Sequence, residues 1–211
     1  MPLPFVDRSS SSLPVQFVSA PKWRAWLKEQ SAPRRGWLES LGLSGSPGDF
    51  AVLPGRDGKA AGAVLVLPAR PVLWDVGALA TRLPAGTWKL GDTAPISATD
   101  AAVAIGLGAW RFDRYKARKA KPGPRILWPQ GADKARATAI IEAISMARDL
   151  ITTPSSDMGP VELAAAAQAM AKAHKAKISV IVGDDLLKKN YPMVHAVGRA
   201  STRAPRLIDL T

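Results

Sequence analysis

A long helical pattern between two proline-containing breaks constrains the fold of this chain more than any other feature of its sequence. Asp133 is a residue type that caps helix N-termini, and Pro154 follows Thr152, where we expect the helix to end. Between them, four apolar residues recur at spacings of four, three and four and so share one helix face: Ile140, Ile144, Ala147 and Ile151. The pattern predicts a linker helix over 133–152 that joins two folded parts.

The part before this helix, residues 1–132, combines strand and helix patterns and predicts a small α/β domain. Residues 1–20 begin with a serine run and three prolines, and we interpret them as a leader that is either mobile or one extended edge segment. Gly55, Asp57 and Gly58 separate two apolar runs and predict a hairpin turn. The expected elements are two short helices within 21–41, strands at 50–53 and 63–67, a helix at 76–83, a strand at 86–90, a helix at 101–118 and a strand at 125–128.

The part after the helix, residues 153–211, predicts the opening βα units of a mixed or parallel sheet. Gly159 and Pro160 suit the N-cap and first-turn positions of a helix that runs to about His174, with Glu162 near its positive end. Strands are expected at 178–182, 194–197 and 207–210, and the first is almost continuously apolar, as when both strand faces are covered. Because these strands need neighbours that the chain does not supply, we expect an incomplete domain.

Composition excludes several classes of protein. The chain has 211 residues, of which 47% are hydrophobic and 22% charged, so wholesale disorder is excluded. The absence of cysteine excludes disulfides, thiolate metal sites and a cysteine nucleophile, and two histidines leave little for a histidine-rich metal centre. The longest uncharged apolar run, 60–69, is about half of the roughly 20 residues that cross a bilayer, and the N-terminus lacks the pattern of a secretory signal. We therefore expect no membrane segment and a cytoplasmic location.

Charge suggests a second class of partner. The 29 basic and 17 acidic residues give a formal net charge of +12, and half of this excess lies in a basic window at 111–125. We favour a solvated helix end and loop there, because basic side chains near a helix C-terminus complement its dipole. The alternative function is a non-enzymatic basic α/β module that binds nucleic acid. Arg199, Arg203 and Arg206 leave a similar choice between an anion grip and salt bridges at an interface or between domains.

Standard enzyme signatures are absent from the sequence. Gly106 and Gly108 resemble part of a dinucleotide-binding fingerprint, but they lie inside a predicted helix, and Arg111 occupies the third glycine position. No phosphate-cradling loop, helical histidine pair or nucleophile elbow is present. Asp184 and Asp185 are adjacent, so their side chains diverge, which favours helix capping over metal binding.

The two histidines have structural interpretations. His174, at the end of an alanine-rich helix, is interpreted as a partner of the C-terminal helix dipole. His195 lies beside Val194 and Ala196 in a predicted apolar strand, and we interpret it as a core histidine rather than a base. Local chemistry alone therefore indicates a basic α/β protein without a visible site.

Longer motifs carry more information than these single residues. The segment 147–160, with Glu162 and Leu163, closely resembles the start of the catalytic domain in the leucyl (cytosol) aminopeptidase family. The following segments resemble the same family's next two motifs: 182–187 with Tyr191 and Pro192, then 195–201 and 204–208. Upstream, 106–116 is similar to the N-terminal domain of the family's bacterial branch. The resemblance covers the chain from about Gly36.

The resemblance implies a two-domain α/β exopeptidase that releases N-terminal residues from peptides with two divalent ions, zinc or manganese, inside a hexamer. The family's metal ligands, catalytic lysine and bicarbonate-binding arginine all follow the last motif matched here. We therefore assign this chain no catalytic, cofactor-binding or metal-binding residue, expect no metal in it, and expect it to be inactive alone. Were the chain active, its site would have to be sought among these residues: Asp157, Glu162, Asp184, Asp185 and His195.

Overall fold

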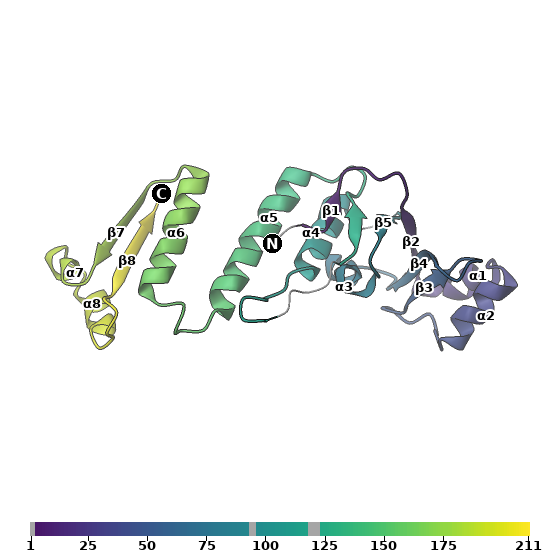
Figure 1. Ribbon diagram of the computed structural model, residues 1–211, viewed down its shortest axis with the longest axis horizontal. Coiled ribbons are helices and arrows are strands. Elements are labelled where there is room, and N and C mark those ends of the chain that lie inside the picture. The colour runs from purple at the N-terminus through teal and green to yellow at the C-terminus, as the bar shows by residue number, and fades with distance from the viewer. Residues whose placement is uncertain (1–2, 93–95, 118–122) are drawn as a thin grey trace. The chain divides into compact units, whose positions relative to one another are not determined.

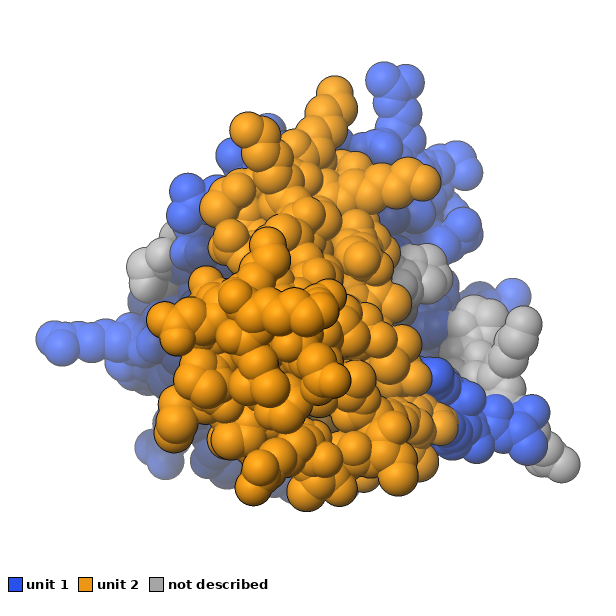
Figure 2. All heavy atoms as spheres, turned by 90° about the vertical axis from the view of Figure 1, so that its left-hand side faces the viewer, with its two compact units in different colours: residues 1–145 blue, residues 146–211 orange. Residues whose placement is uncertain are grey.

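The computed structural model describes residues 3–92, 96–117 and 123–211, and they divide into two compact units. Unit 1 is Met1–Ser145 and unit 2 is Met146–Thr211, coloured separately in Figure 2. The boundary falls inside the long helix α5 (Lys134–Thr152), the helix that the sequence pattern predicts. Asp133 caps it as expected, because its Oδ1 accepts a hydrogen bond of 2.9 Å from the backbone N–H of Arg136.

Within the described residues, unit 1 is built on a six-stranded sheet in which only the β3–β4 pair is antiparallel. The mixed α/β fold expected from the sequence is thereby confirmed (Figure 1). The predicted hairpin is also confirmed, as β3 and β4, with Gly58 at a φ of 75° in its turn. In sheet order the strands are β1 (Phe5–Val6), β6 (Arg125–Leu127), β5 (Thr87–Leu90), β2 (Leu13–Ser19), β4 (Ala60–Leu67) and β3 (Phe50–Pro54).

Helices cover both faces of this sheet, and β4 shows why its sequence is continuously apolar. Ala63 and Leu65 pack into a core with α4 (Ala98–Gly108), whereas Val64 and Val66 pack into a second core with Trp23. Because successive side chains of a strand point to opposite faces, a strand buried on both sides needs an apolar residue at every position. The remaining helices of unit 1 are η1 (Ala20–Lys22), α1 (Trp23–Lys28), α2 (Ala32–Ser40), η2 (Leu73–Val76) and α3 (Leu79–Arg82).

Three predictions for unit 1 need correction. The mobile alternative for residues 1–20 is wrong for β2, which lies between β4 and β5 with Val15 fully buried. Of the same stretch, β1 does form an extended segment at the sheet edge. The helix expected at 101–118 ends at Gly108, and the helix expected at 76–83 is divided into η2 and α3 around Gly77.

Two glycines let α4 pack closely on its neighbours. A Cβ added to Gly106 would lie 2.3 Å from Cδ1 of Ile141 on α5, and one added to Gly108 would lie 2.1 Å from the carbonyl oxygen of Gly77. Real Cβ atoms do not approach other atoms so closely. Both glycines therefore serve close packing inside a helix rather than a dinucleotide-binding turn.

Unit 2 contains the end of α5 and five further elements, with α6 packed against β8 (Figure 1). They are α6 (Pro160–His174), β7 (Ile178–Val182), α7 (Asp185–Lys188), α8 (Pro192–Gly198) and β8 (Arg206–Leu210). The described strands β7 and β8 pair antiparallel, with Ile178 opposite Leu210, so of the two arrangements expected, mixed or parallel, this pair fits only the mixed one. No residue of β7 is fully buried in the described chain, so its two faces are not both covered there.

The strand predicted at 194–197 is wrong, because these residues belong to α8. Pro192 occupies the first turn of this helix, where its fixed φ and missing N–H are tolerated. The β-branched Val194 and Val197 favoured a strand locally, but they lie in a short helix of a larger packed unit. Among the described residues, no helix is both long and apolar enough to cross a bilayer.

Candidate functional site

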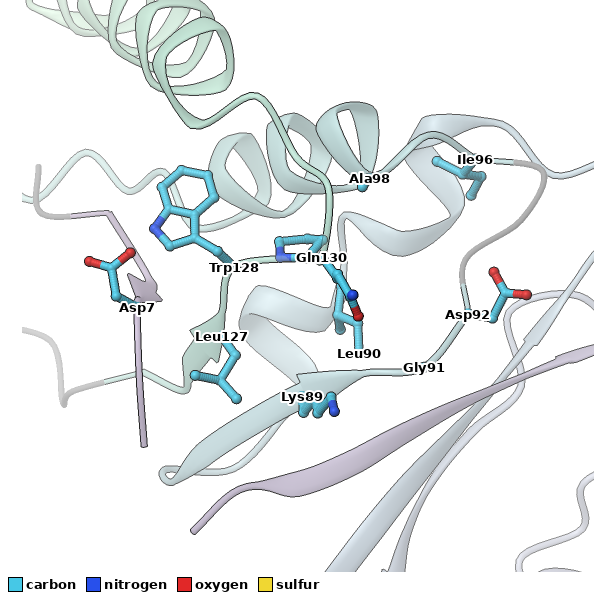
Figure 3. Close-up of a pocket in the computed structure, with 11 residues that line it drawn as sticks. Asp7, Lys89, Leu90, Gly91, Asp92, Ile96, Ala98, Leu127, Trp128 and Gln130 are labelled. Carbon is cyan, nitrogen blue, oxygen red and sulfur yellow. The ribbon is translucent and has the colours of Figure 1, made fainter. Parts of the chain in front are cut away.

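A cavity of about 700 Å³ opens in unit 1 at the carboxyl ends of three parallel strands (Figure 3). Parallel strands end at the same edge of a sheet, and the crevice outside that edge is where α/β folds commonly bind ligands. The residues that line it follow β1, β5 and β6 or begin α4: Asp7, Lys89, Leu90, Gly91, Asp92, Ile96, Ala98, Leu127, Trp128, Pro129 and Gln130.

Trp128 and Asp7 form one wall of this cavity. The indole of Trp128 stacks on Phe5 with ring centroids 4.3 Å apart, which fixes β6 against β1. Lys134, in the first turn of α5, donates a hydrogen bond to the carboxylate of Asp7, and its Nζ lies 5.8 Å from the centroid of the Trp128 ring. The Asp7 carboxylate therefore enters the cavity wall already partly neutralised.

The end of β5 forms the opposite wall. Lys89 and Asp92 are exposed, whereas Leu90 is buried between them. Gly91 donates a backbone hydrogen bond of 2.8 Å to Val15 on β2, and a Cβ at Gly91 would lie 2.9 Å from that same carbonyl oxygen. Glycine at this position thus keeps the end of β5 tight against β2.

Sequence reasoning missed this cavity. Its polar residues do not form a recognised motif, and they come from stretches more than 30 positions apart. The sequence carried part of the signal, because Lys89 lies in the predicted strand at 86–90 and Asp92 follows it, whereas no strand was predicted before Asp7. Only the strand order of the sheet brings Asp7 to the same edge.

In unit 2, Arg203 binds two of the residues that the sequence analysis considered. Its guanidinium donates hydrogen bonds of 3.1 Å to Oε2 of Glu162 and 2.8 Å to the carbonyl oxygen of Ser156. The same Glu162 oxygen accepts a 2.9 Å hydrogen bond from the backbone N–H of Gly159, as expected at the start of α6. Hydrogen bonds from the backbone N–H groups of Glu162 and Gly159, with Arg203 nearby, lower the pKa of the Glu162 carboxyl.

The two adjacent aspartates have separate partners. Asp184 Oδ1 lies 3.1 Å from Nε2 of His195, and Asp185 forms a 2.7 Å ion pair with Lys188. This ion pair lowers the pKa of Asp185 and raises that of Lys188. His195 therefore lies on a helix beside an exposed carboxylate rather than in an apolar strand, which corrects the interpretation of it as a core strand histidine.

The described residues do not assemble a metal centre. No group of three or more histidine, aspartate or glutamate side chains converges in residues 3–92, 96–117 and 123–211. Glu162 is bound to Arg203, and Asp184 and Asp185 have different partners, His195 and Lys188. The structure therefore does not bring the candidate acids together as ligands of one ion.

The remaining arginines and the basic window have different surroundings. Arg203 makes a salt bridge with Glu162 inside unit 2, which is neither an anion grip nor a salt bridge at an interface or between domains. Arg199 is exposed, and the buried Nε of Arg206 has no partner within the described residues. Because α4 ends at Gly108, residues 111–117 of the window are loop rather than helix end, and Lys116 pairs there with Asp113 at 2.7 Å. Arg125, at the end of the window, begins β6. Residues 118–122 lie outside the described part of the chain, and nucleic-acid binding stays a prediction.

Family models match the chain in two consecutive segments. Residues 13–129 match the M17 aminopeptidase N-terminal domain, and residues 145–211 match the catalytic domain of the cytosol aminopeptidase family. A probable cytosol aminopeptidase from Streptomyces avermitilis is 36% identical over 92% of this chain and 44% of its own length. A probable cytosol aminopeptidase from Streptomyces coelicolor is 35% identical over 82% of this chain and 41% of its own length.

Solved structures agree with these relatives. The cytosol aminopeptidase from Coxiella burnetii has a TM-score of 0.87 and 33% identity, covering 98% of this chain and 46% of that one. The bottromycin maturation enzyme BotP, in complex with Mn, has a TM-score of 0.68 at 23% identity over 95% of this chain and 45% of that one, which shows a shared fold. The chain thus spans less than half the length of the relatives it matches, and the resemblance seen in the sequence is confirmed.

Proposed function

The chain belongs to the M17 cytosol aminopeptidase family, and from that premise we propose that it is the N-terminal part of a metal-dependent leucyl aminopeptidase that releases N-terminal residues from peptides. The observation that carries this proposal is the order of the two matches, an N-terminal domain over 13–129 followed by the opening of a catalytic domain over 145–211. In the longer enzyme, two divalent ions, manganese or zinc, would activate the attacking water and polarise the scissile carbonyl.

Among the described residues, no group of acidic and histidine side chains fits that pair of ions. Such a site needs several carboxylates that converge on ions about 3.5 to 4 Å apart. Glu162 pairs with Arg203, Asp185 with Lys188, and Asp184 with His195, so each of the three acids faces a different partner and they do not converge on one point. We therefore propose that this chain contributes no ligand to the dinuclear site and is inactive alone.

Its residues would instead shape the scaffold of the enzyme. Arg203 holds the loop between α5 and α6, and α6 packs on β8 within the segment that matches the catalytic domain. Assembly as a homo-oligomer, the family hexamer, and a cytoplasmic location complete the proposal. They are supported by family membership and by the cytosol aminopeptidase names of the Streptomyces relatives.

A hydrolysis assay with two proteins tests this function. The purified chain should not hydrolyse leucine amide with added manganese or zinc. A chimera that continues this chain with the remaining sequence of the Streptomyces avermitilis relative should hydrolyse it, and a chelator should abolish that activity. The Streptomyces relative itself is the positive control.

Two results would contradict the proposal. Chelator-sensitive turnover by the chain alone that survives repurification would require a site among Asp157, Glu162, Asp184, Asp185 and His195. A chimera that is folded by circular dichroism but inactive would remove the support for the aminopeptidase role.

A further inference from the structure

The sheet of unit 1 has one long open edge, at β3. In the described sheet β1 and β3 are the terminal strands, but β1 has only two residues, whereas β3 has five. An open edge carries unpaired backbone N–H and C=O groups and is a template for pairing with a strand of another chain. The aminopeptidase function proposed above does not use this edge.

Backbone hydrogen bonds show which groups of β3 point outward. In an antiparallel pair, alternate residues turn both backbone groups toward the partner strand, and the residues between them turn both groups away. Just before β3, the carbonyl oxygen of Asp49 accepts a bond of 2.8 Å from Val66 on β4. By this alternation the outward positions are Phe50, Val52 and Pro54. Because proline has no N–H, only Phe50 and Val52 offer an incoming strand both a donor and an acceptor.

Trp37 occupies this edge. Its indole N–H donates a hydrogen bond of 3.1 Å to the outward carbonyl oxygen of Val52. The helix that carries Trp37, α2, packs on β3 (Figure 1), and the adjacent Leu38 is fully buried in the core beneath it. Because neighbouring strands lie about 4.7 to 4.9 Å apart, a ring held at hydrogen-bond distance from this carbonyl stands where the next strand would run.

We propose that the edge of β3 is a pairing surface for a second copy of this chain and that Trp37 keeps it closed. Two copies of β3, placed antiparallel across a two-fold axis, would exchange bonds between Phe50 of one copy and Val52 of the other. Half of these bonds end on the Val52 carbonyl, which the indole of Trp37 holds.

The edge itself indicates a second copy as the partner. The same two residues, Phe50 and Val52, supply its donors and its acceptors, so the edge is complementary to itself. The strand Phe50–Pro54 carries no charged residue, so two copies of it meet without like charges opposite each other. Natural proteins commonly protect edges of this kind with a covering group or a proline, and β3 has both.

The substitution Trp37→Ala tests the proposal. It opens the edge and should leave α2 folded, because alanine is a strong helix former and Leu38 still anchors the helix. The full chain is used with Met193→Lys and Val197→Lys, which remove two exposed apolar side chains of unit 2. In analytical ultracentrifugation the Trp37→Ala chain should dimerise, with a dissociation constant about tenfold or more below that of its parent.

Trp74→Ala in the same parent is the matched control. Trp74 is also an exposed tryptophan of unit 1, at 60% against 42% for Trp37, and its indole makes no hydrogen bond within the described residues. It should leave the dissociation constant unchanged. Trp37→Phe keeps a ring on α2 and removes the indole N–H, so it should strengthen dimerisation in the same direction but less, and it decides the question if Trp37→Ala does not fold.

Hydrogen exchange separates pairing at the edge from a merely structural role of Trp37. Pairing should slow exchange of the Phe50 and Val52 amides, and slow it further as protein concentration rises. Loss of packing alone would speed exchange in α2 and β3 at every concentration. The proposal is overturned if the folded Trp37 variants stay monomeric, if a dimer forms without slower exchange at Phe50 and Val52, or if Trp74→Ala dimerises as strongly.

Discussion

Arg203 shows how single side chains fix the start of the catalytic-domain segment. It hydrogen-bonds Glu162 and Ser156, which lie 41 and 47 positions away in the sequence. These bonds connect the segment before β8 to the loop before α6. A Cβ at Gly159 would lie 2.2 Å from Nη1 of Arg203. The glycine therefore provides the space that the guanidinium occupies, and the two residues act as one unit.

The first prediction tests this coupling. Arg203→Ala removes hydrogen bonds from a partly exposed charged group, and we expect it to lower the free energy of unfolding of unit 2 by about 1 kcal/mol. Gly159→Ala should cost a similar amount, because its methyl group displaces the guanidinium, and the double variant should cost little more than either. Urea unfolding measures all three. Additive losses in the double variant would show that the residues act independently, and Arg199→Ala, an exposed arginine, is the control.

The second prediction concerns pH. The pKa of Glu162 lies below its ordinary value of 4.5 because backbone N–H groups and Arg203 stabilise the charged carboxylate. A lowered folded-state pKa adds stability above the unfolded-state pKa, and this stability is lost as pH falls through the folded-state pKa. Wild type should therefore exceed Glu162→Gln in stability at pH 7, and the difference should shrink as pH falls below about 4.5. A difference that stays constant from pH 7 to pH 3 would contradict this origin. Exposed Glu142→Gln controls for the loss of a carboxylate.

Helix N-caps were predictable from the sequence, but the long-range partners of individual side chains were not. Asp133 and the Gly159–Glu162 pattern act within four residues of the helix ends they stabilise, so local sequence was sufficient. The contacts of Arg203 with Glu162 and of His195 with Asp184 depend on how the chain folds back on itself. The cavity residues are a further case, because only the strand order brings Asp7, Lys89 and Trp128 to one edge.

At the scale of secondary-structure elements, α4 depends on the two glycines that bring it close to its neighbours. Gly108 faces the backbone of Gly77 and Gly106 faces Ile141, so the helix contacts a turn on one side and α5 on the other. Backbone atoms cannot move aside as a flexible side chain can. Gly108 is therefore the less tolerant of the two positions.

The third prediction compares glycines in two helices. Gly108→Ala should destabilise unit 1 by about 2 kcal/mol or more through overpacking against Gly77. Gly36→Ala lies in α2, where an added Cβ meets nothing within 4 Å, and should stabilise by about 0.5 to 1 kcal/mol through helix propensity. Thermal unfolding of both variants measures the contrast. Equal effects of the two substitutions would show that propensity, not packing, decides at Gly108.

The sequence predicted helices and strands best where a turn or cap residue marked an end, or where an apolar pattern ran over many residues. The hairpin of β3 and β4 has its turn glycine, and α5 has both a cap and an apolar stripe. The direction of the β7–β8 pair stayed open between a mixed and a parallel sheet, because a continuous apolar run such as Ile178–Val182 predicts a strand but not the direction of its partner. The strand expected at 194–197 failed because β-branched residues outweighed the helix-start signal of Pro192.

At the scale of the whole molecule, the chain divides into two units at a boundary within α5, and the loop that follows this helix is where we expect a protease to cut first. The loop after α5 has exposed residues at 154–156. Arg203, from a later part of the chain, donates a hydrogen bond to the carbonyl oxygen of Ser156 in this loop. We expect limited proteolysis to cut first within 153–158 and to leave an N-terminal fragment that includes α5. Arg203→Ala should speed this cut and Arg199→Ala should not, as mass spectrometry of timed digests will show. A first cut within unit 1 would contradict this expectation.

Unit 2 exposes large apolar side chains that a folded domain normally covers, and this determines how the isolated chain behaves in solution. Met193 and Val197 on α8 are 75% and 85% exposed. Exposed apolar surface of this kind drives association between copies. We expect the chain to self-associate through unit 2, with an apparent mass in light scattering that rises with concentration.

Substitution on each unit decides whether that surface is responsible. Met193→Lys with Val197→Lys should reduce the apparent mass without loss of stability, because the replaced side chains are exposed. The matched control is Val72→Lys with Trp74→Lys in unit 1, two apolar side chains that are 58% and 60% exposed. A chain that stays monomeric at high concentration would show that Met193 and Val197 do not drive self-association. A control pair that reduces association equally would show the same. Because the chain spans 44% of the length of the Streptomyces avermitilis relative, the same two lysines should impair folding of the chimera with that sequence if the added sequence covers α8.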